Sequence, residues 1–474
     1  MIGGVNPMNS SKYLNIAQKI QVHLRPDGCI VLPKSDSEEE TERISRFSSD
    51  FRQMSFEKID PTIQPKFLNE IYRDIFIALE KSFDVSTIIT SLSSKYNTEE
   101  IKSSIYRLER MSYLKLKKKI DDEISKKIIL TGSPNHFYPL HVVVELTTKC
   151  NLRCKHCYAS SGKGKDISYT ELFQALSSLK DRGLCGIELT GGEPLLHPHF
   201  QDIVEFCCEN LEIVGVLSNG TLIDEQMAEF LSQFNNILIS ISIDSSSPQF
   251  HDDFRGVKGT WQKAVNAIKL LTSYNIPVRV SMAVTPENFR DLESTVLLAK
   301  ELGALAFSFA PILPFGRGAT IRWRFTPEEV VEYRKLERKV MEKYKELIPR
   351  FPAEVIEALS LPNCGAGHRT VVISPTGIVR PCVIMPEDFM PLGNIFTDSL
   401  EKIFSSPIIY KLAKIRWPNK YDCGMCRYEK FCRYCIYRGI VMYRFGIQDW
   451  VACGDKCTWA KNVKIQEILQ LSQR

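Results

Sequence analysis

Short apolar runs alternate with longer segments of mixed polarity through the middle of the chain. In each longer segment apolar residues recur every three or four positions, which predicts an amphipathic helix, whereas the apolar runs predict buried strands. A regular alternation of strand and helix is typical of a parallel sheet covered by helices. The predicted strands span residues 142–146, 186–190, 213–217, 237–243, 278–284 and 305–309. Six such repeats predict an α/β fold in the form of an open, partial (β/α)6 barrel.

The first part of the chain shows a different pattern. Two apolar runs, 19–24 and 29–32, flank a turn sequence that contains Pro26 and Gly28, which predicts a β-hairpin. Three helical segments follow, at 68–79, 85–96 and 101–111. A hairpin with three helices predicts a small winged-helix-like domain over residues 1–130.

A winged helix can bind DNA, and the sequence bears on this alternative. The last of the three predicted helices, 101–111, carries Glu109 among Lys102, Arg107 and Arg110, and no basic stripe stands out along it. Proteins that bind DNA gather basic residues on one face or along one helix instead. We therefore expect no nucleic-acid partner.

Two segments divide the rest of the chain. Residues 132–135, Gly-Ser-Pro-Asn, are typical of a linker, and the long polar pattern at 325–347 predicts a bridging helix. The predicted domains are therefore 1–130, a barrel at 136–325, and the bridging helix with a C-terminal domain at 326–474.

Composition narrows the function classes. A chain of 474 residues with 44% apolar residues can fill two or three cores, and a net charge of +5 is too small to indicate nucleic acid. No apolar run reaches the roughly 20 residues of a membrane-spanning helix, and the start of the chain lacks a signal-peptide core. We expect a cytoplasmic protein with no membrane partner. In a large cytosolic chain, 15 cysteines indicate metal binding or catalysis instead of disulfides.

Three cysteines directly follow the first predicted barrel strand. Cys150, Cys154 and Cys157 place three thiolates within eight residues, which suits an iron-sulfur cube bound at three corners and leaves one iron free. The same spacing also occurs on one face of a helix, where cysteines can be packing residues, and cysteines also bind structural zinc. The β-branched run before the motif favours a loop after a strand, and zinc usually takes four ligands.

This Cys-x3-Cys-x2-Cys motif, with His156 before its last cysteine, resembles that of the radical S-adenosylmethionine (radical SAM) superfamily. The resemblance implies a [4Fe-4S] cluster on Cys150, Cys154 and Cys157, with S-adenosylmethionine (SAM) bound to its free iron. It also implies the reaction of the superfamily, in which an electron from the cluster cleaves SAM to a 5′-deoxyadenosyl radical. The sequence identifies no catalytic side chain beyond these ligands.

Glycines and polar residues follow the later barrel strands, whose C-terminal ends gather the working residues in such folds. Gly191, Gly192 and Glu193 come after the second strand. Two glycines let the backbone approach a ligand, and a carboxylate can accept bonds from an ammonium group. The resemblance implies that this motif holds the amino group of SAM. It further implies that SAM is contacted by residues at the ends of the third and fourth strands, namely Asn219, Ser242 and Asp244.

The C-terminal segment contains the densest group of cysteines. Their order is Cys364, Cys382, then Cys423-x2-Cys426-x5-Cys432-x2-Cys435, and finally Cys453 and Cys457. The pattern resembles the SPASM extension of radical SAM enzymes, which binds two auxiliary iron-sulfur clusters. It implies one cluster on Cys364, Cys382 and Cys435, and a second on Cys423, Cys426, Cys432 and Cys457.

Two features depart from the usual SPASM pattern. Two residues separate Cys432 from Cys435 where three are usual, and Cys453 competes with Cys457 for the last ligand position. If both Cys453 and Cys457 are ligands, every cluster iron that needs a cysteine has one. If only one of them is a ligand, one iron is left without a protein ligand. Two zinc sites are the alternative, since paired cysteines also suit zinc.

The chain from about 135 to 465 also resembles sactisynthases of the subtilosin type. The resembling stretches are 139–141, 251–256, 363–367, 379–382, 392–395 and 457–462. The implied activity joins a cysteine sulfur to the α-carbon of another residue in one ribosomally made precursor peptide, as in bacteriocin biosynthesis. The N-terminal outline is similar to domains that bind the leader of such peptides by β-augmentation. An electron donor such as flavodoxin or ferredoxin completes the expected partners.

Two other functions remain open from the sequence. A SPASM enzyme could instead mature another protein, a quinone-cofactor precursor or a tetrapyrrole. A chain with a winged-helix outline and grouped cysteines could also be a non-enzymatic, metal-binding regulator that contacts DNA.

Overall fold

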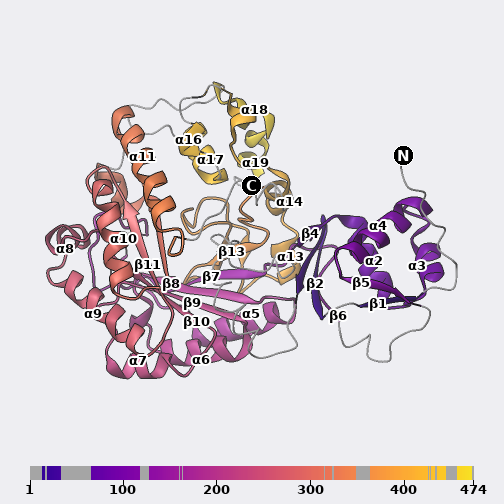
Figure 1. The fold of residues 1–474 in the computed structure, drawn as a ribbon, viewed down its shortest axis with the longest axis horizontal. Coiled ribbons are helices and arrows are strands. Elements are labelled where there is room, and N and C mark those ends of the chain that lie inside the picture. Colours follow the sequence, from indigo (N-terminus) through magenta and orange to yellow (C-terminus); the bar gives the residue numbers. More distant parts are fainter. Residues whose placement is uncertain are drawn as a thin grey trace.

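The computed structural model describes residues 13–16, 19–33, 66–117, 128–159, 161–162, 164–313, 315–322, 325–348, 363–424, 426, 429–432, 435–444 and 456–471. Within these residues the chain forms a helix-covered barrel, a C-terminal extension beside it, and a small N-terminal domain that stands at one end (Figure 1).

Six parallel strands form the partial barrel, in the order in which they occur in the chain. They are β7 (His141–Thr147), β8 (Gly186–Gly191), β9 (Ile213–Ser218), β10 (Ile237–Ser242), β11 (Val278–Val284) and β12 (Ala306–Pro311). The outer face is covered by α5 (Tyr169–Lys180), α6 (Phe200–Asn210), α7 (Glu225–Leu231), α8 (Pro248–Arg255), α9 (Thr260–Ser273) and α10 (Leu292–Glu301) (Figure 1). The six predicted strands and the barrel are confirmed.

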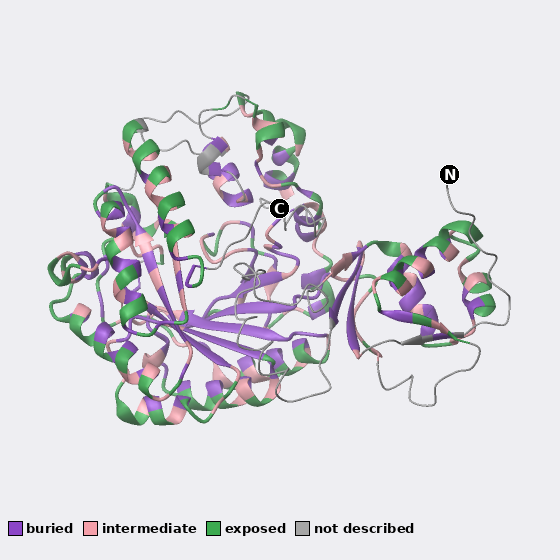
Figure 2. Cartoon of the chain, in the orientation of Figure 1, coloured by how far each residue is buried: buried purple, intermediate pink, exposed green. Residues whose placement is uncertain are grey.

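The two faces of the barrel sheet differ in polarity. Residues that point outward, such as Val144, Leu189 and Ile239, are buried against the helices in the main core. The alternate residues of each strand point inward. Among these, Arg279 Nη2 donates to Glu188 Oε1 at 3.2 Å. The strands are therefore buried along most of their length (Figure 2), and the concave face can still offer polar side chains to a ligand.

The C-terminal segment joins the same sheet. β13 (Thr370–Ile373) pairs in parallel with β7, and β14 (Ile378–Arg380) and β15 (Gly393–Asn394) extend the sheet antiparallel. Without this pairing β7 would be an open edge strand with unpaired backbone groups. The domain limits stay a prediction, but the segments on both sides of the expected boundary at residue 325 share one nine-stranded sheet.

The expected bridging helix is present as α11 (Pro327–Lys343). It begins at a capping box formed by Thr326 and Glu329. The later helices are short: α13 (Leu400–Phe404), α14 (Pro407–Lys414), α15 (Lys420–Cys423), α16 (Glu429–Cys432), α17 (Ile436–Arg444), α18 (Thr458–Asn462) and α19 (Ile465–Leu471). None of the helices in the described part of the chain has the length and apolar character that crossing a bilayer requires.

The N-terminal domain contains the predicted hairpin, β2 (Ile20–Arg25) and β3 (Gly28–Pro33). The hairpin lies in a sheet of order β4-β3-β2-β6, where β4 is Lys66–Leu68 and β6 is Ile128–Gly132. Gly132, which we expected in a linker, therefore ends a strand. The three predicted helices are α2 (Glu70–Leu79), α3 (Val85–Leu92) and α4 (Thr98–Arg110), and β1 (Tyr13–Ile16) pairs with β5 (Leu114–Lys117). These elements enclose a core of their own.

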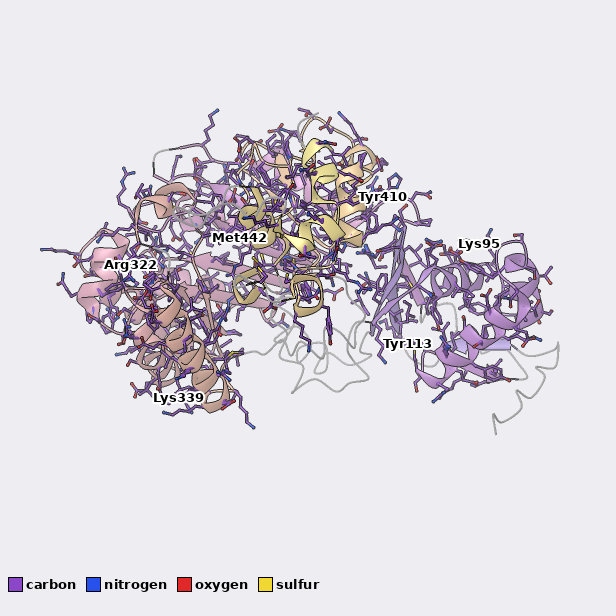
Figure 3. All side chains as sticks on the ribbon, turned by 90° about the horizontal axis from the view of Figure 1, so that it is seen from above. Lys95, Tyr113, Arg322, Lys339, Tyr410 and Met442 are labelled. Carbon is purple, nitrogen blue, oxygen red and sulfur yellow. The ribbon has the colours of Figure 1, made fainter. Side chains whose placement is uncertain are left out.

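Two residues of β3 outside that core pack on the barrel. Ile30 and Leu32 form a buried apolar cluster with Leu140 and Cys185, which immediately precede β7 and β8. Because the barrel strands are parallel, the N-terminal domain sits at their N-terminal ends, opposite the edge from which the loop after β7 emerges. Figure 3 shows this domain, marked by Lys95 and Tyr113, at one end of the molecule.

Candidate functional site

The three cysteines of the first motif lie in the loop after β7. This loop forms turns without a helix in its described residues, as the strand-then-loop prediction requires. The side chains of Cys150, Cys154 and Cys157 line one cavity of about 460 Å³ at the C-terminal edge of the barrel. Burial is the main cause that raises the pKa of Cys150 to about 11, and the neighbouring Cys154 and Cys157 contribute to this rise. Metal binding must therefore displace a proton from this thiol.

The C-terminal end of α8 holds one side of the cysteine loop. The backbone amides of Arg153 and Lys155 donate to the carbonyls of Arg255 and Phe254, at 3.1 and 2.9 Å. Gly256 follows with a left-handed φ of 75°, and a Cβ at this position would lie 2.7 Å from the Arg153 carbonyl oxygen. Glycine is therefore required where α8 meets the loop.

A short helical turn, η4 (Gly316–Thr320), holds the other side of the loop. The amide of Arg317 donates to the carbonyl of Cys157, and its Nε donates to the carbonyl of Cys154, both at 2.9 Å. Its Nη1 donates to the carbonyl of Ser161 at 2.9 Å. One arginine thus fixes three backbone carbonyls of the loop.

His156, the residue before the last cysteine of the motif, is part of the cavity wall. Its ring stacks on Phe254 with centroids 4.4 Å apart and planes at 13°. Burial is the main cause that lowers the pKa of His156 to about 4, so the ring is neutral at pH 7.

The two glycines after β8 lie directly against the cysteine loop. A Cβ on Gly191 would lie 2.3 Å from the carbonyl oxygen of Thr147, and one on Gly192 would lie 2.0 Å from that of Lys149. Both glycines also line the cavity. They are needed for the close approach of the β8 end to the loop, in addition to any approach of a ligand that we predicted.

Glu193, which follows the two glycines, is bonded to the end of the next strand. Its carboxylate is fully buried and accepts hydrogen bonds from Ser218 Oγ and from the amide of Asn219, both at 2.8 Å. Burial raises the pKa of Glu193 to about 7, and these two donors oppose the rise. The carboxylate therefore ties the end of β8 to the end of β9, and it does not line the cavity.

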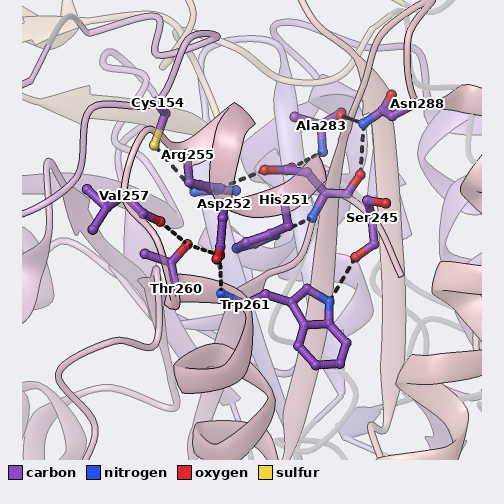
Figure 4. A network of polar contacts seen from close by, with 11 residues as sticks. Cys154, Ser245, His251, Asp252, Arg255, Val257, Thr260, Trp261, Ala283 and Asn288 are labelled. Carbon is purple, nitrogen blue, oxygen red and sulfur yellow. Dashed lines mark hydrogen bonds and ion pairs between the residues drawn. The ribbon is translucent and has the colours of Figure 1, made fainter. Parts of the chain in front are cut away.

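Asp244 likewise lies behind the cavity wall. It accepts from Arg255 Nε at 2.6 Å and from the amide of Ala283 at 3.0 Å, and Arg255 Nη1 also lies 3.9 Å from Cys154 Sγ (Figure 4). Burial would raise the pKa of Asp244, but the charge and hydrogen bond of Arg255, together with the nearby His156 and His251, outweigh burial and lower the pKa to about 2. The pair therefore brings a fixed positive charge to a cysteine of the motif, and such a charge favours the thiolate.

The two remaining predicted SAM contacts, Asn219 and Ser242, do line the cavity. Asn219 Nδ2 donates to Asn151 Oδ1 at 2.9 Å, which joins the end of β9 to the cysteine loop. The structure thus brings together at one cavity the three cysteines, both glycines, Asn219 and Ser242, and places Glu193 and Asp244 as supports.

The opposite wall of the cavity belongs to the C-terminal segment. Ile384 and Arg438 line it, and each follows a predicted ligand, Cys382 and Cys435, by two or three residues. Cys382 and Cys435 pack on one apolar cluster with Leu313 of the same cavity.

The C-terminal cysteines form two groups. Burial raises the pKa of Cys435, and the nearby Cys364 adds to the rise. Cys364 therefore lies close to Cys435, which packs on the same apolar cluster as Cys382. Burial raises the pKa of Cys423 to about 11, with contributions from Cys426 and Cys457. One group thus holds Cys364, Cys382 and Cys435, and the other holds Cys423, Cys426 and Cys457. Their role as cluster ligands stays a prediction.

Two predicted ligands, Cys432 and Cys453, are not part of these groups. Cys432, expected beside Cys423, is buried in the apolar cluster on which Cys382 and Cys435 pack. Cys453 lies outside the described residues.

No three His, Cys, Asp or Glu side chains in the described ranges converge as ligands of one metal ion. An iron-sulfur cube requires wider spacing, because each thiolate binds a different iron. Three thiols around one cavity fit such a cube.

The sequence also matches known families and proteins. Residues 144–299 match the radical SAM superfamily, and residues 364–435 match SPASM, an iron-sulfur cluster-binding domain. The chain is 32% identical over 468 residues to the antilisterial bacteriocin subtilosin biosynthesis protein AlbA of Bacillus subtilis, which covers 96% of this chain and 98% of that protein. The chain belongs to the radical SAM/SPASM peptide maturases.

Further similarities agree with this family. The sporulation killing factor maturation protein SkfB of Bacillus subtilis is 31% identical over 61% of this chain and 70% of its own length. Solved structures of Streptococcus suis SuiB, bound to SAM or to the precursor peptide SuiA, share the fold with a TM-score of 0.60. They have 16% and 15% sequence identity, and each covers 91% of this chain and 97% of SuiB.

The family confirms the predicted enzyme class over a non-enzymatic regulator. This maturase is a radical SAM enzyme, and its cofactors are SAM and the iron-sulfur clusters of the radical SAM and SPASM regions. The sequence did not lead us to Arg255, Arg317 or Arg380. Two of these three arginines fall within the stretches 251–256 and 379–382 that resemble sactisynthases, so a signal was present for them.

A buried ion pair joins the first cysteine loop to the SPASM segment of the maturase. Arg380 Nη2 donates to Glu145 Oε1 at 2.6 Å, and Tyr158 Oη donates to the same oxygen at 3.2 Å. The Arg380 and Glu145 side chains are only 3% and 8% exposed. Tyr158 directly follows Cys157, and Arg380 precedes Cys382 by two residues, so the pair connects two loops that carry predicted ligands.

Breaking this pair should destabilise the fold. We expect Arg380→Met to lower the free energy of unfolding by about 3–5 kcal/mol, because it leaves a buried Glu145 charge uncompensated. The double variant Glu145→Leu/Arg380→Met should cost less, since no unpaired charge remains. Anaerobic urea unfolding measures both. A single-variant cost equal to or below that of the double variant would contradict a paired role.

Gly192→Ala should displace the cysteine loop, because its Cβ would meet the Lys149 carbonyl oxygen. We expect a cost of about 1–3 kcal/mol and loss of most iron from the first site, measured by iron analysis after anaerobic reconstitution. Gly259→Ala is the control, since its Cβ meets no atom within 4 Å and it carries only backbone strain. Full iron content in the Gly192 variant would disprove the steric argument.

Proposed function

We propose that this maturase forms sulfur-to-carbon thioether crosslinks in a ribosomally made precursor peptide. The single observation that carries the proposal is that the relation to AlbA extends over 96% of the chain, including the N-terminal domain and the C-terminal cysteines. AlbA is named for subtilosin biosynthesis, SkfB for maturation of the sporulation killing factor, and SuiB has been solved with its precursor peptide.

The first site would hold the reactive cofactors. Cys150, Cys154 and Cys157 would bind the [4Fe-4S] cluster, and SAM would occupy the cavity. When bound together, the two groups supply the 5′-deoxyadenosyl radical chemistry of the superfamily. We assign direct SAM contacts to the cavity-lining residues Gly191, Gly192, Asn219 and Ser242, and indirect roles to Glu193 and Asp244.

The protein contributes position and the exclusion of water. Apolar side chains, among them Leu152, Leu217, Phe309 and Leu313, line the cavity between the two cysteine-bearing walls. A peptide held there lies beside both walls while bulk water is kept away, which protects a reactive intermediate from side reactions. In the proposed crosslink an S–H and a C–H bond break, an S–C bond forms, and two protons and two electrons leave the peptide. One hydrogen atom would pass to the SAM-derived radical, the remaining electron to an auxiliary cluster, and the other proton to solvent.

The far wall would carry the auxiliary iron-sulfur clusters. We assign Cys364, Cys382 and Cys435 to one cluster. We assign Cys423, Cys426 and Cys457 to the other, with Cys432 and Cys453 as the two candidates for its remaining ligand.

The N-terminal domain is the proposed site of leader recognition. β4 is the last strand of its sheet and pairs only with β3 among the described strands, so an extended peptide can add beside it. A hollow of about 810 Å³ nearby is lined by residues of α2 and α4, including Tyr72, Glu100 and Arg107.

We also propose that a small electron carrier such as flavodoxin or ferredoxin reduces the first cluster.

Replacing Cys150, Cys154 and Cys157 by Ala should abolish formation of 5′-deoxyadenosine from SAM under anaerobic, reducing conditions. The fall should reach the background of a protein-free reaction, because the variant lacks all three proposed ligands. Liquid chromatography of the reaction measures it. Cys208→Ala serves as the control, since Cys208 lies on α6, packs against the main core and does not line the cavity. Continued SAM cleavage by the triple variant would end the assignment of the first site.

The precursor peptide should lose two hydrogens per crosslink, as measured by mass spectrometry after reaction. The same peptide without its leader should react more slowly, by roughly a factor of ten or more if leader binding is worth about 1.4 kcal/mol or more. Cysteine-to-serine variants of the peptide should lose the mass change one crosslink at a time. Equal rates with and without the leader would contradict leader recognition.

A further inference from the structure

An arginine of the N-terminal domain is buried in the C-terminal extension. Arg25 ends β2 at the tip of the hairpin and is only 1% exposed, although its guanidinium is always charged. Asp27 pairs with it through two hydrogen bonds, from Nε at 2.9 Å and from Nη2 at 3.0 Å. Its guanidinium also lies over the ring of Phe137, 4.9 Å from the centroid.

Helix α2 also fixes the backbone of the hairpin tip. Arg73 of α2 donates from Nη1 to the carbonyls of Arg25 and Pro26, at 3.0 and 2.8 Å. The position of the Arg25 side chain is therefore tied to the helices of the N-terminal domain.

On its other side Arg25 contacts His368, which lies two residues before β13. Nη2 lies 2.9 Å from His368 Nδ1, and Nη1 donates to the carbonyl of His368 at 3.3 Å. An arginine can only donate, so Nδ1 must accept and the proton of the neutral ring must be on Nε2. Nε2 then donates to Asn363 Oδ1 at 3.0 Å.

Asn363 fixes the backbone on both sides of Cys364. Its Oδ1 also accepts from the amide of Gly365 at 2.8 Å, and its Nδ2 donates to the carbonyls of Leu412 and Ile415, at 2.8 and 2.7 Å. The side chain is 1% exposed. A continuous chain of hydrogen bonds therefore runs from the hairpin tip to the two neighbours of a predicted cluster ligand.

We propose that the N-terminal domain completes the auxiliary-cluster site, through a positioning relay of Arg25, His368 and Asn363 that holds Cys364 in place. This rests on the ligand role proposed for Cys364. Groups that orient metal ligands from behind change metal affinity by about 10–100-fold when they are lost. The domain is then a structural part of the SPASM site in addition to any role in binding a leader.

One consequence concerns deletion of the N-terminal domain. Removing it would take away Arg25 and leave His368 Nδ1 without its donor. A deletion variant would lose auxiliary-cluster integrity together with leader binding, so its inactivity would report on both at once.

The test uses full-length, anaerobically reconstituted enzyme and measures iron release to a chelator such as EDTA. Arg25→Met should release one cluster's share of iron about 10–100-fold faster than the wild type. Cys364→Ala should fail to retain the same share. Arg182→Met is the matched control, because Arg182 donates to Glu401 and to the Ser178 carbonyl and takes no part in the relay.

Two further variants distinguish a relay from general destabilisation. His368→Gln keeps one donor and one acceptor and should release iron more slowly than His368→Leu. The double variant Arg25→Met/His368→Leu should be no worse than the poorer single variant, because both act through one chain of contacts. Additive effects of the two substitutions would overturn the relay. Should Arg25→Met fail to fold, the two His368 variants alone decide.

The outcomes also separate this inference from the proposed function. If Cys364→Ala loses iron and Arg25→Met does not, the relay is overturned and the cluster assignment stands. If Cys364→Ala retains all iron, the ligand role of Cys364 is wrong and the relay falls with it.

Discussion

The pairing of β13 with β7 is the constraint on which the rest of this maturase depends. β7 leads into the loop that carries Cys150, whereas β13 lies in the chain between Cys364 and Cys382. A strand ladder has a fixed register, because a slip of one residue would turn every side chain to the other face. One ladder therefore sets the position of the barrel cysteines relative to those of the C-terminal segment.

Several buried carboxylates near the cavity form ion pairs with buried arginines. Three such pairs in which both side chains are buried are Asp244 with Arg255, Glu145 with Arg380, and Glu188 with Arg279. An isolated buried charge is very costly, and a pair compensates for the lost hydration only in good geometry. Each pair joins segments that are separate in the chain. We infer that their main contribution is a defined arrangement of strands and loops around the cavity, more than net stability.

Contacts between segments far apart in the sequence also attach the N-terminal domain to the rest of the molecule. It has its own core, as the separate apolar pattern of its hairpin and helices predicts. It nevertheless places one arginine inside the C-terminal extension and an apolar strand face on the start of the barrel. A domain attached in this way has a fixed orientation, which agrees with the leader recognition that we propose for it.

The sequence by itself determined the features that depend on local spacing. The period of apolar residues predicted the six barrel strands, the hairpin and the three helices, because side-chain direction repeats within each element. The separation of Cys150, Cys154 and Cys157 predicted three thiols around one cavity, because a short loop cannot carry its residues far apart.

Only the tertiary structure decided which groups meet across the chain. It bonded the carboxylates of Glu193 and Asp244 to Ser218 and Arg255, placed Cys432 in the apolar cluster on which Cys382 and Cys435 pack, and buried Arg25 against His368. The physical reason is that a side chain's partner depends on the packing of segments far apart in the sequence, about which local periodicity and spacing carry no information.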